Sequence, residues 1–212
     1  MPIAHRAGNS YEALERALTA GVDAVEIDAR LDHGRFAGRH DGRLFFLPIY
    51  GGRWYLRFSL ARVTTLDEVL RRVAGKASLL VDVKNTSAGA LRLLLEVLRA
   101  HGVVAETRMS SPHWDLMRIA QESDPELRVY YSMGKPEELR RFWQLQGKTH
   151  EVKGVSIKES LLDKALVDEF LAEGIEIAAY NVYDLRRARE LVAWGVAVII
   201  SGNLTLLRAL KE

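Results

Sequence analysis

Short apolar runs alternate with longer stretches of helical period along the whole chain of 212 residues. The runs are rich in β-branched residues and predict strands, whereas the longer stretches carry their apolar residues on one helical face. Strands are predicted at 2–6, 24–28, 78–84, 106–111, 128–133, 153–158, 175–182 and 197–202. Helices are predicted at 10–21, 64–75, 87–102, 111–123, 135–147, 160–174, 184–195 and 203–212. Several helical stretches open on Ser, Thr, Asp or Asn and close on Gly, as helix caps require.

A strand followed each time by a helix is typical of βα units around a parallel sheet. Eight such units in a chain of this length predict an α/β fold of the (β/α)₈ TIM-barrel type, with residues 1–212 forming a single domain. A doubly wound open sheet is the main alternative. No glycine-rich phosphate-binding fingerprint follows the first strand, which disfavours the dinucleotide-binding form of that alternative.

Residues 30–58, after the second strand, break this rhythm. Turn signals at His33-Gly34, Asp41-Gly42 and Gly51-Gly52 predict a β-hairpin extension followed by a loop rich in aromatic and arginine residues. Loops that follow barrel strands often carry function. We therefore expect part of the functional site here.

Composition narrows the classes of partner. The 30 basic and 28 acidic residues are interspersed and give a net charge of only +2, which predicts no nucleic-acid partner. The absence of cysteine excludes disulfides, thiolate metal sites and a cysteine nucleophile. The longest apolar runs are far shorter than the roughly 20 residues that span a bilayer, so we expect no stable membrane insertion. No signal peptide precedes the first strand, and we expect a cytoplasmic location.

Charged side chains gather at the ends of the first three predicted strands and in the loop between the second and third. Alternation along a strand places Glu26 and Asp28 on one face and their apolar neighbours on the other, and it does the same for Asp82 and Lys84. The active face of a TIM barrel is the C-terminal end of its strands. The candidate site residues are therefore His5, Arg6, Glu26, Asp28, His40, Asp82 and Lys84.

These residue types point to phosphodiester cleavage. Three carboxylates at a barrel mouth repel one another unless a cation lies between them, and oxygen donors suit a hard ion such as Mg²⁺ or Ca²⁺. His5 and His40 supply side chains that titrate near neutrality, as general acid–base catalysis requires. Arg6 and Lys84 supply positive charge for phosphate oxygens. The pair Glu26 and Asp28, or the pair Asp82 and Lys84, would by itself more often be a chance pair of surface groups. The occurrence of both pairs together with the two histidines favours a functional site.

The chain resembles the glycerophosphodiester phosphodiesterase family, to which sphingomyelinase D-like phospholipases are related. The resemblance lies in the order of seven motifs along essentially the whole chain, which are HR, NSYEAL, GVDAVEIDARL, RHDG, LLVDVKN, YNVYD and GVAVIISGN. The chain differs from the family's usual motifs at two positions. It has Ala7 where the family has Gly, and it has Asp82 where the family usually has Glu and the phospholipase branch has Asp. Only Asn9 matches the family's Pro-Glu-Asn segment.

The resemblance implies a TIM barrel with essential histidines at His5 and His40 and one divalent metal ion held by Glu26, Asp28 and Asp82. It implies that Arg6 and Lys84 hold the phosphate. The implied reaction cleaves a small glycerophosphodiester to glycerol 3-phosphate and an alcohol. The two histidines would exchange protons with the nucleophile and the leaving group, and the nucleophile is either water or the neighbouring glycerol hydroxyl.

Two other functions remain open at this stage. One is a lysophospholipase D-type enzyme, in which aromatic and apolar residues of the loop 43–58 form a lip for acyl chains. That lip would consist of Phe45, Phe46, Ile49, Tyr50, Trp54, Tyr55 and Phe58. The same residues could instead pack over the barrel or form a homodimer contact. The other function is a drifted barrel that binds a phosphorylated ligand without turnover.

Overall fold

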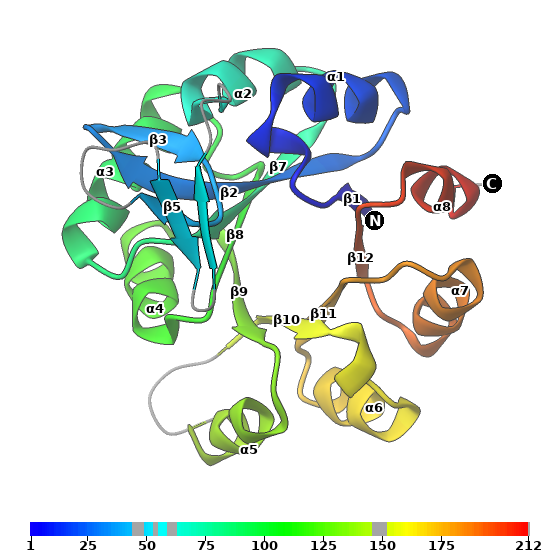
Figure 1. The fold of residues 1–212 in the computed structure, drawn as a ribbon. Coiled ribbons are helices and arrows are strands. Elements are labelled where there is room, and N and C mark those ends of the chain that lie inside the picture. Colours follow the sequence, from blue (N-terminus) through cyan, green and yellow to red (C-terminus); the bar gives the residue numbers. More distant parts are fainter. Residues whose placement is uncertain (44–48, 53–54, 59–62, 146–151, 212) are drawn as a thin grey trace.

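The computed structural model describes residues 1–43, 49–52, 55–58, 63–145 and 152–211. Its main sheet contains eight parallel strands, β1 (Pro2–Ala4), β2 (Ala24–Asp32), β7 (Ser78–Val83), β8 (Thr107–Ser111), β9 (Arg128–Met133), β10 (Gly154–Lys158), β11 (Glu176–Tyr180) and β12 (Val198–Ser201). Each strand pairs with the next in the chain, and β1 pairs with both β12 and β2. The ring is therefore closed, as Figure 1 shows, which confirms the barrel and excludes the open sheet.

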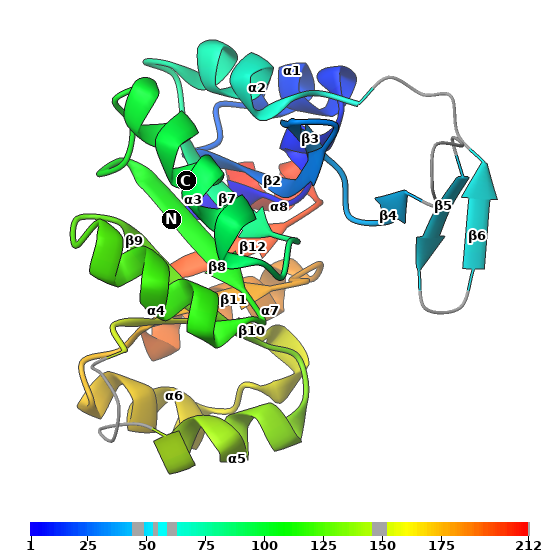
Figure 2. The same cartoon turned by 90° about the vertical axis from the view of Figure 1, so that its left-hand side faces the viewer.

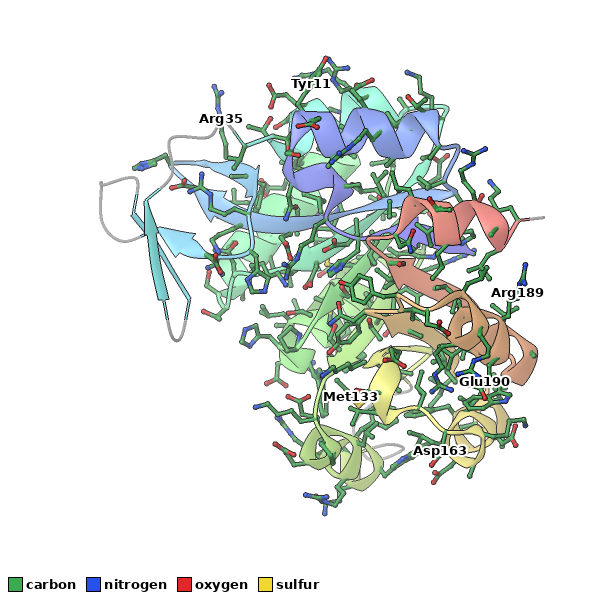
Figure 3. All side chains as sticks on the ribbon, turned by 45° about the vertical axis from the view of Figure 1, so that its right-hand side comes forward. Tyr11, Arg35, Met133, Asp163, Arg189 and Glu190 are labelled. Atoms are coloured by element: carbon green, nitrogen blue, oxygen red, sulfur yellow. The ribbon has the colours of Figure 1, made fainter. Side chains whose placement is uncertain are left out.

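A helix follows every barrel strand and lies outside the ring (Figure 1). The helices are α1 (Tyr11–Thr19), α2 (Leu66–Val73), α3 (Ala88–Ala100), α4 (Trp114–Ser123), α5 (Pro136–Leu145), α6 (Lys164–Ala172), α7 (Leu185–Trp194) and α8 (Leu204–Ala209). Ser10 and Thr65 illustrate the predicted caps, because each side chain accepts a backbone hydrogen bond in the first turn of its helix. Charged residues such as Arg189 and Glu190 of α7 project from the outer surface (Figure 3).

Two apolar cores follow from the alternation of side chains along the strands. Val25 and Ile27 of β2 point outward and belong to the larger core between the strands and the helices. Residues of the opposite parity fill the barrel interior with a smaller core. That inner core consists of Ile3, Ala24, Leu80, Tyr130, Ala178, Val198 and Ile200. Glu26, Asp28 and Asp82 share the parity of this inner core and lie nearer the C-terminal ends of their strands.

The extension after β2 differs in part from the prediction. The hairpin is confirmed, because β3 (Arg35–Gly38) pairs antiparallel with β2 across a turn at His33-Gly34, where both φ angles are positive. The following region is a second sheet of β4 (Gly42–Arg43), β5 (Ile49–Gly52) and β6 (Tyr55–Phe58), which stands away from the barrel (Figure 2).

The prediction of a loop in this region was therefore wrong in part, because Gly51 and Gly52 lie within β5 and not in a turn. Residues with high β-propensity, such as Tyr50 and Tyr55, favour strands here. The apolar lip suggested for acyl chains falls on residues 44–58, whose side chains lie outside the described residues.

No helix in the described parts of the chain combines the length and the apolar character needed to cross a bilayer.

Two glycines allow the segment after β1 to pack closely on β2 and β3. A Cβ atom on Gly8 would lie 2.7 Å from Cβ of Ile27 and 3.1 Å from the backbone oxygen of Glu26. A Cβ atom on Gly38 would lie 2.8 Å from the backbone oxygen of Gly8 and 2.9 Å from Cα of Asn9. The short 3₁₀ helix η1 (Ala7–Asn9) therefore lies directly against the strand that carries Glu26.

We expect Gly8→Ala to lower the free energy of unfolding by about 1–3 kcal/mol, because the added methyl group overpacks this contact. Urea denaturation measures the change. Gly89→Ala is the matched control, since Gly89 lies on α3 with no atom within 4 Å of the added Cβ, and we expect it to stabilise the protein by about 0.5–1 kcal/mol. Equal midpoints for Gly8→Ala and the wild type would contradict the close approach.

Candidate active site

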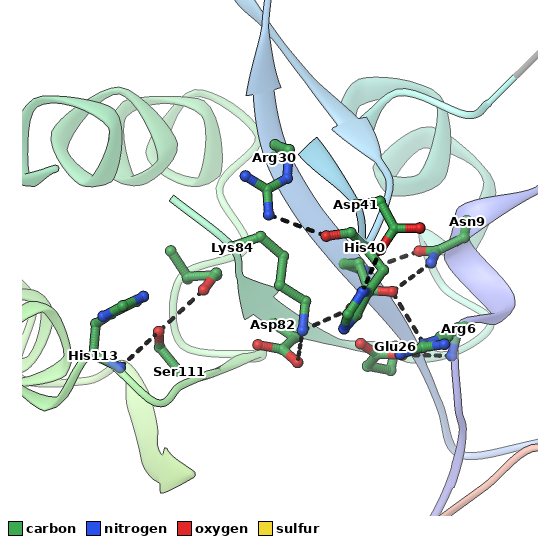
Figure 4. Close-up of polar contacts among 12 residues, drawn as sticks. Arg6, Asn9, Glu26, Arg30, His40, Asp41, Asp82, Lys84, Ser111 and His113 are labelled. Carbon is green, nitrogen blue, oxygen red and sulfur yellow. Dashed lines mark hydrogen bonds and ion pairs between the residues drawn. The ribbon is translucent and has the colours of Figure 1, made fainter. Parts of the chain in front are cut away.

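A cavity of about 320 Å³ opens at the C-terminal ends of the barrel strands, where the pattern of charged residues predicts the site. Six of the seven candidate residues line it, namely His5, Arg6, Glu26, His40, Asp82 and Lys84. The seventh, Asp28, lies beside them and is only 1% exposed. Figure 4 shows polar contacts that Arg6, Glu26, His40, Asp82 and Lys84 make.

Strand register brings the three carboxylates together. Asp28 of β2 and Asp82 of β7 are direct partners across the parallel pair, and Glu26 lies two residues before Asp28 on the same face. One carboxylate oxygen from each residue lies within 4.8 Å of those of the other two. Glu26 is 2% exposed, so two of the three acids are almost completely removed from solvent.

Burial and mutual repulsion shift the pKa values of these acids. Burial, together with the charges of Asp28 and Asp82, raises the pKa of Glu26 well above its usual value. Burial also raises the pKa of Asp82, although Lys84 opposes the shift. For Asp28, burial acts in the same upward direction, but the charge and hydrogen bonding of Lys84 and a hydrogen bond from Asn9 outweigh it and lower the pKa.

Two cationic side chains hold the acids in place. Lys84 Nζ lies 2.9 Å from Oδ1 of Asp28 and 2.6 Å from Oδ2 of Asp82. Arg6 Nε lies 3.2 Å from Oδ2 of Asp28. Two positive charges therefore face three carboxyl groups, so charge balance requires either one more positive charge or a protonated Glu26.

The donor set fits a hard divalent cation. All three converging side chains offer oxygen, the ligand that Mg²⁺ and Ca²⁺ prefer. Oδ1 of Asp82 is buried and has no hydrogen-bond partner among the described residues, as a ligand atom awaiting an ion would. Glu26, Asp28 and Asp82 could therefore hold a divalent ion.

The turn after β1 is shaped to meet these acids. Arg6 adopts a left-handed conformation with φ 55°, and its backbone N–H donates to Oε2 of Glu26. Three residues later, the Asn9 side chain donates to Oδ2 of Asp28 at 2.6 Å and accepts the backbone N–H of Asp28 at 2.9 Å. A strained backbone of this kind persists where surrounding contacts demand it. Asn9, noted in the sequence only as a motif match, is thus a positioning residue for Asp28.

The two histidines occupy different environments. His5 is anchored by its backbone N–H, which donates to the oxygen of Ser201 at 2.9 Å. Burial and the charge of Arg6 lower the pKa of His5 to about 4, so its ring is neutral at physiological pH. His40 is 48% exposed, and its Nδ1 lies 3.0 Å from Oδ1 of Asp41. The Arg30 guanidinium donates to the backbone oxygen of His40 at 3.0 Å and holds the residue at the cavity.

Several residues of the cavity were not singled out from the sequence. Ser110, Ser132, Ser156 and Tyr180 all line it. Their positions on the inner face of β8, β9, β10 and β11 were available from strand parity, but neutral hydroxyl groups carry no motif. His113, which precedes α4, does not line the cavity among the described residues, and its backbone N–H donates to Oγ of Ser111.

Comparison with known proteins relates the fold to solved structures. No family model matches the chain, and no curated protein matches it. A glycerophosphodiester phosphodiesterase from Agrobacterium tumefaciens is similar at a TM-score of 0.74 and 21% identity, over 99% of this chain and 98% of that one. An Oleispira antarctica phosphodiesterase, solved with the product sn-glycerol-3-phosphate, gives a TM-score of 0.77 and 20% identity over 100% and 97%. A Parabacteroides distasonis glycerophosphodiester phosphodiesterase gives 0.74 and 19% over 100% and 98%. These likenesses establish a shared barrel fold.

The lowered pKa of His5 makes stability depend on pH. Because the pKa is about 4 in the folded state and about 6.5 for an unperturbed histidine in the unfolded chain, the unfolded state binds more protons between these pH values. The free energy of unfolding therefore falls as pH decreases from 6.5 to 4. We expect His5 to account for about 3 kcal/mol of that loss. Urea denaturation with chelator present should show a difference between wild type and His5→Gln that changes by this amount across the interval. A difference independent of pH would contradict the burial of a neutral ring.

Proposed function

We propose that the protein is a phosphoric diester hydrolase that cleaves glycerophosphodiesters to glycerol 3-phosphate and an alcohol. The observation that carries the proposal is the convergence of two histidines, two cations and three carboxylates in one cavity. The shared fold supports it, since the similar proteins from Agrobacterium tumefaciens and Parabacteroides distasonis are glycerophosphodiester phosphodiesterases and the Oleispira antarctica phosphodiesterase binds sn-glycerol-3-phosphate as product.

In this proposal Glu26, Asp28 and Asp82 hold one divalent ion, Mg²⁺ or Ca²⁺. When bound, such an ion supplies charge that stabilises negative phosphoryl oxygens in the transition state. It also supplies the positive charge that two cations alone do not provide to three acids.

Arg6 and Lys84 orient the phosphoryl group. Arg6 is 48% exposed, and Lys84 is the cation that lies between Asp28 and Asp82. Both line the cavity, so their guanidinium and ammonium groups can donate to phosphate oxygens as these gain charge. Their pairing with carboxylates fixes their positions before substrate binds, which lowers the ordering cost of binding.

The histidines divide the proton transfers between them. His5 is neutral at pH 7 and accepts the proton of the attacking hydroxyl, from water or from the neighbouring substrate hydroxyl, as the new P–O bond forms. His40, held beside the Asp41 carboxylate, donates a proton to the leaving oxygen as the old P–O bond breaks. This assignment follows from the burial of His5 and the exposure of His40.

The leaving group separates these roles experimentally. We expect His5→Ala and His40→Ala each to lower kcat for a glycerophosphodiester by about 10²- to 10⁴-fold. With bis(p-nitrophenyl) phosphate, whose leaving group needs no proton, His40→Ala should lose less than about tenfold while His5→Ala keeps its full loss. Steady-state kinetics on both substrates measures the effect.

His101→Gln is the matched control, because His101 ends α3 on the outside of the barrel and pairs with Asp67. It should leave both rates within about twofold of wild type. If His40→Ala lowered kcat equally on the two substrates, His40 would not be the general acid. If neither substrate is hydrolysed by the wild type with Mg²⁺ or Ca²⁺, the hydrolase proposal fails in favour of a barrel that only binds phosphate.

Removal of one carboxylate tests the ion site without reference to turnover. We expect Asp82→Asn to weaken Mg²⁺ or Ca²⁺ binding by at least about tenfold in calorimetry, because it removes the charge of one of three acidic donors. Asp168→Asn is the control, since Asp168 is exposed on α6 and pairs only with Lys164 among the described ion pairs. Unchanged affinity for Asp82→Asn would remove Asp82 from the ion site, and full turnover after exhaustive chelation would remove the ion from the reaction.

A further inference from the structure

Arg30 continues the row of charged residues on the inner face of β2. Glu26, Asp28 and Arg30 are alternate residues of this strand, so they share one face. Arg30 follows the last residue of β2 that pairs with β7, and it is the direct partner of Ala37 across the β2–β3 pair. Among the described residues it is not part of the cavity lining. Any effect of Arg30 on the reaction is therefore exerted through another residue.

The half-buried side chain of Arg30 makes a single hydrogen bond among the described residues. Its Nη2 donates to the backbone oxygen of His40 at 3.0 Å (Figure 4). Its Nε is buried and has no partner. Burial lowers the pKa of Arg30, while the charges of Asp41 and Asp28 oppose that shift. Because buried donors without a partner are costly, packing alone does not explain an arginine at this position.

The backbone that carries Arg30 is fixed on both sides. The N–H of Leu31 donates to Oδ1 of Asn85 at 2.7 Å, and the N–H of Lys84 donates to the oxygen of Ala29 at 3.0 Å. Pairing with β3 fixes Arg30 itself. The guanidinium group therefore extends from a rigid part of the sheet.

His40 lies between two strands and depends on contacts of a different kind. The N–H of the preceding residue, Arg39, donates to the oxygen of Asp28 at 2.7 Å. The contact of His40 Nδ1 with Oδ1 of Asp41 lies within one segment, so it does not fix that segment relative to the barrel. Among the described residues, the hydrogen bond that ties the His40 backbone to the barrel comes from Arg30.

We propose that Arg30 is a positioning residue for proton donation. By holding the backbone oxygen of His40, its guanidinium group keeps the His40 ring within reach of the leaving oxygen. The inference rests on the proposed hydrolase function and on the role of His40 as the general acid. A general acid must lie within hydrogen-bond reach of the atom that it protonates, and a misplacement of about 1 Å can cost about 10²-fold in rate.

The leaving group tests this role, because a residue that acts through His40 matters only where His40 matters. We expect Arg30→Met, which keeps a long side chain without a donor, to lower kcat for a glycerophosphodiester by about 10- to 100-fold with KM within about twofold of wild type. With bis(p-nitrophenyl) phosphate, kcat should stay within about threefold of wild type. Arg30→Lys keeps a charge and a donor and should lose less than Arg30→Met.

A double variant tests whether Arg30 acts through His40. Because the two effects share one step, Arg30→Met/His40→Ala should hydrolyse the glycerophosphodiester within about twofold of His40→Ala alone. Arg99→Met is the control, since Arg99 pairs with Asp124 on the outside of the barrel. It should leave both rates within about twofold of wild type. Steady-state kinetics on both substrates measures all four variants.

Equal losses of Arg30→Met on the two substrates, a raised KM, or a further loss in the double variant would overturn the proposal. Urea denaturation establishes that Arg30→Met is folded, and Arg30→Gln carries the same comparison if it is not. If His40→Ala shows the difference between substrates and the Arg30 variant does not, the acid role of His40 stands and the role of Arg30 fails. If His40→Ala shows no difference, both roles fail.

Discussion

The burial of two carboxylates side by side on β2 is the constraint around which the surrounding structure is organised. Glu26 and Asp28 are almost completely removed from solvent, and buried charges are costly unless they are paired and hydrogen-bonded. The turn after β1 meets this demand with the backbone N–H of Arg6 and the side chain of Asn9. Lys84 meets it from β7. Much of the unusual backbone and close packing near the mouth of the barrel follows from these two acids.

Much of the fold could be predicted from the sequence. The spacing of apolar residues distinguishes helices from strands, and the alternation of side chains along a strand determines which of them face the barrel interior. Each predicted barrel strand and helix is present among the described residues, and the differences lie at element ends. The first strand ends at Ala4 and not at residue 6, because Arg6 turns into the left-handed region to reach Glu26. The second continues to Asp32, because pairing with β3 stabilises its last four residues. Such shifts arise from tertiary contacts, which local propensity does not contain.

The charged residues and histidines of the candidate site could be predicted from the sequence, whereas its neutral residues could not. The structure brings the seven charged or histidine candidates into one region, as strand parity suggests. The roles of Asn9 in holding Asp28 and of Gly8 in allowing close packing depend on contacts between segments about 20 residues apart. The sheet β4–β6 depends on pairings that turn signals alone did not define.

Closure of the barrel connects the two ends of the chain, and this affects when the site can form. β1 has only three residues and is held between β2 and β12. Its partners on β12 are Ile199, Ile200 and Ser201, almost 200 residues further along the chain. His5 depends on the same junction through the oxygen of Ser201. Contacts of such long sequence separation are costly in loop-closure entropy and form slowly. During synthesis, the first residues of the site are made long before the strand that fixes them, so the chain becomes competent only after its last βα unit has left the ribosome.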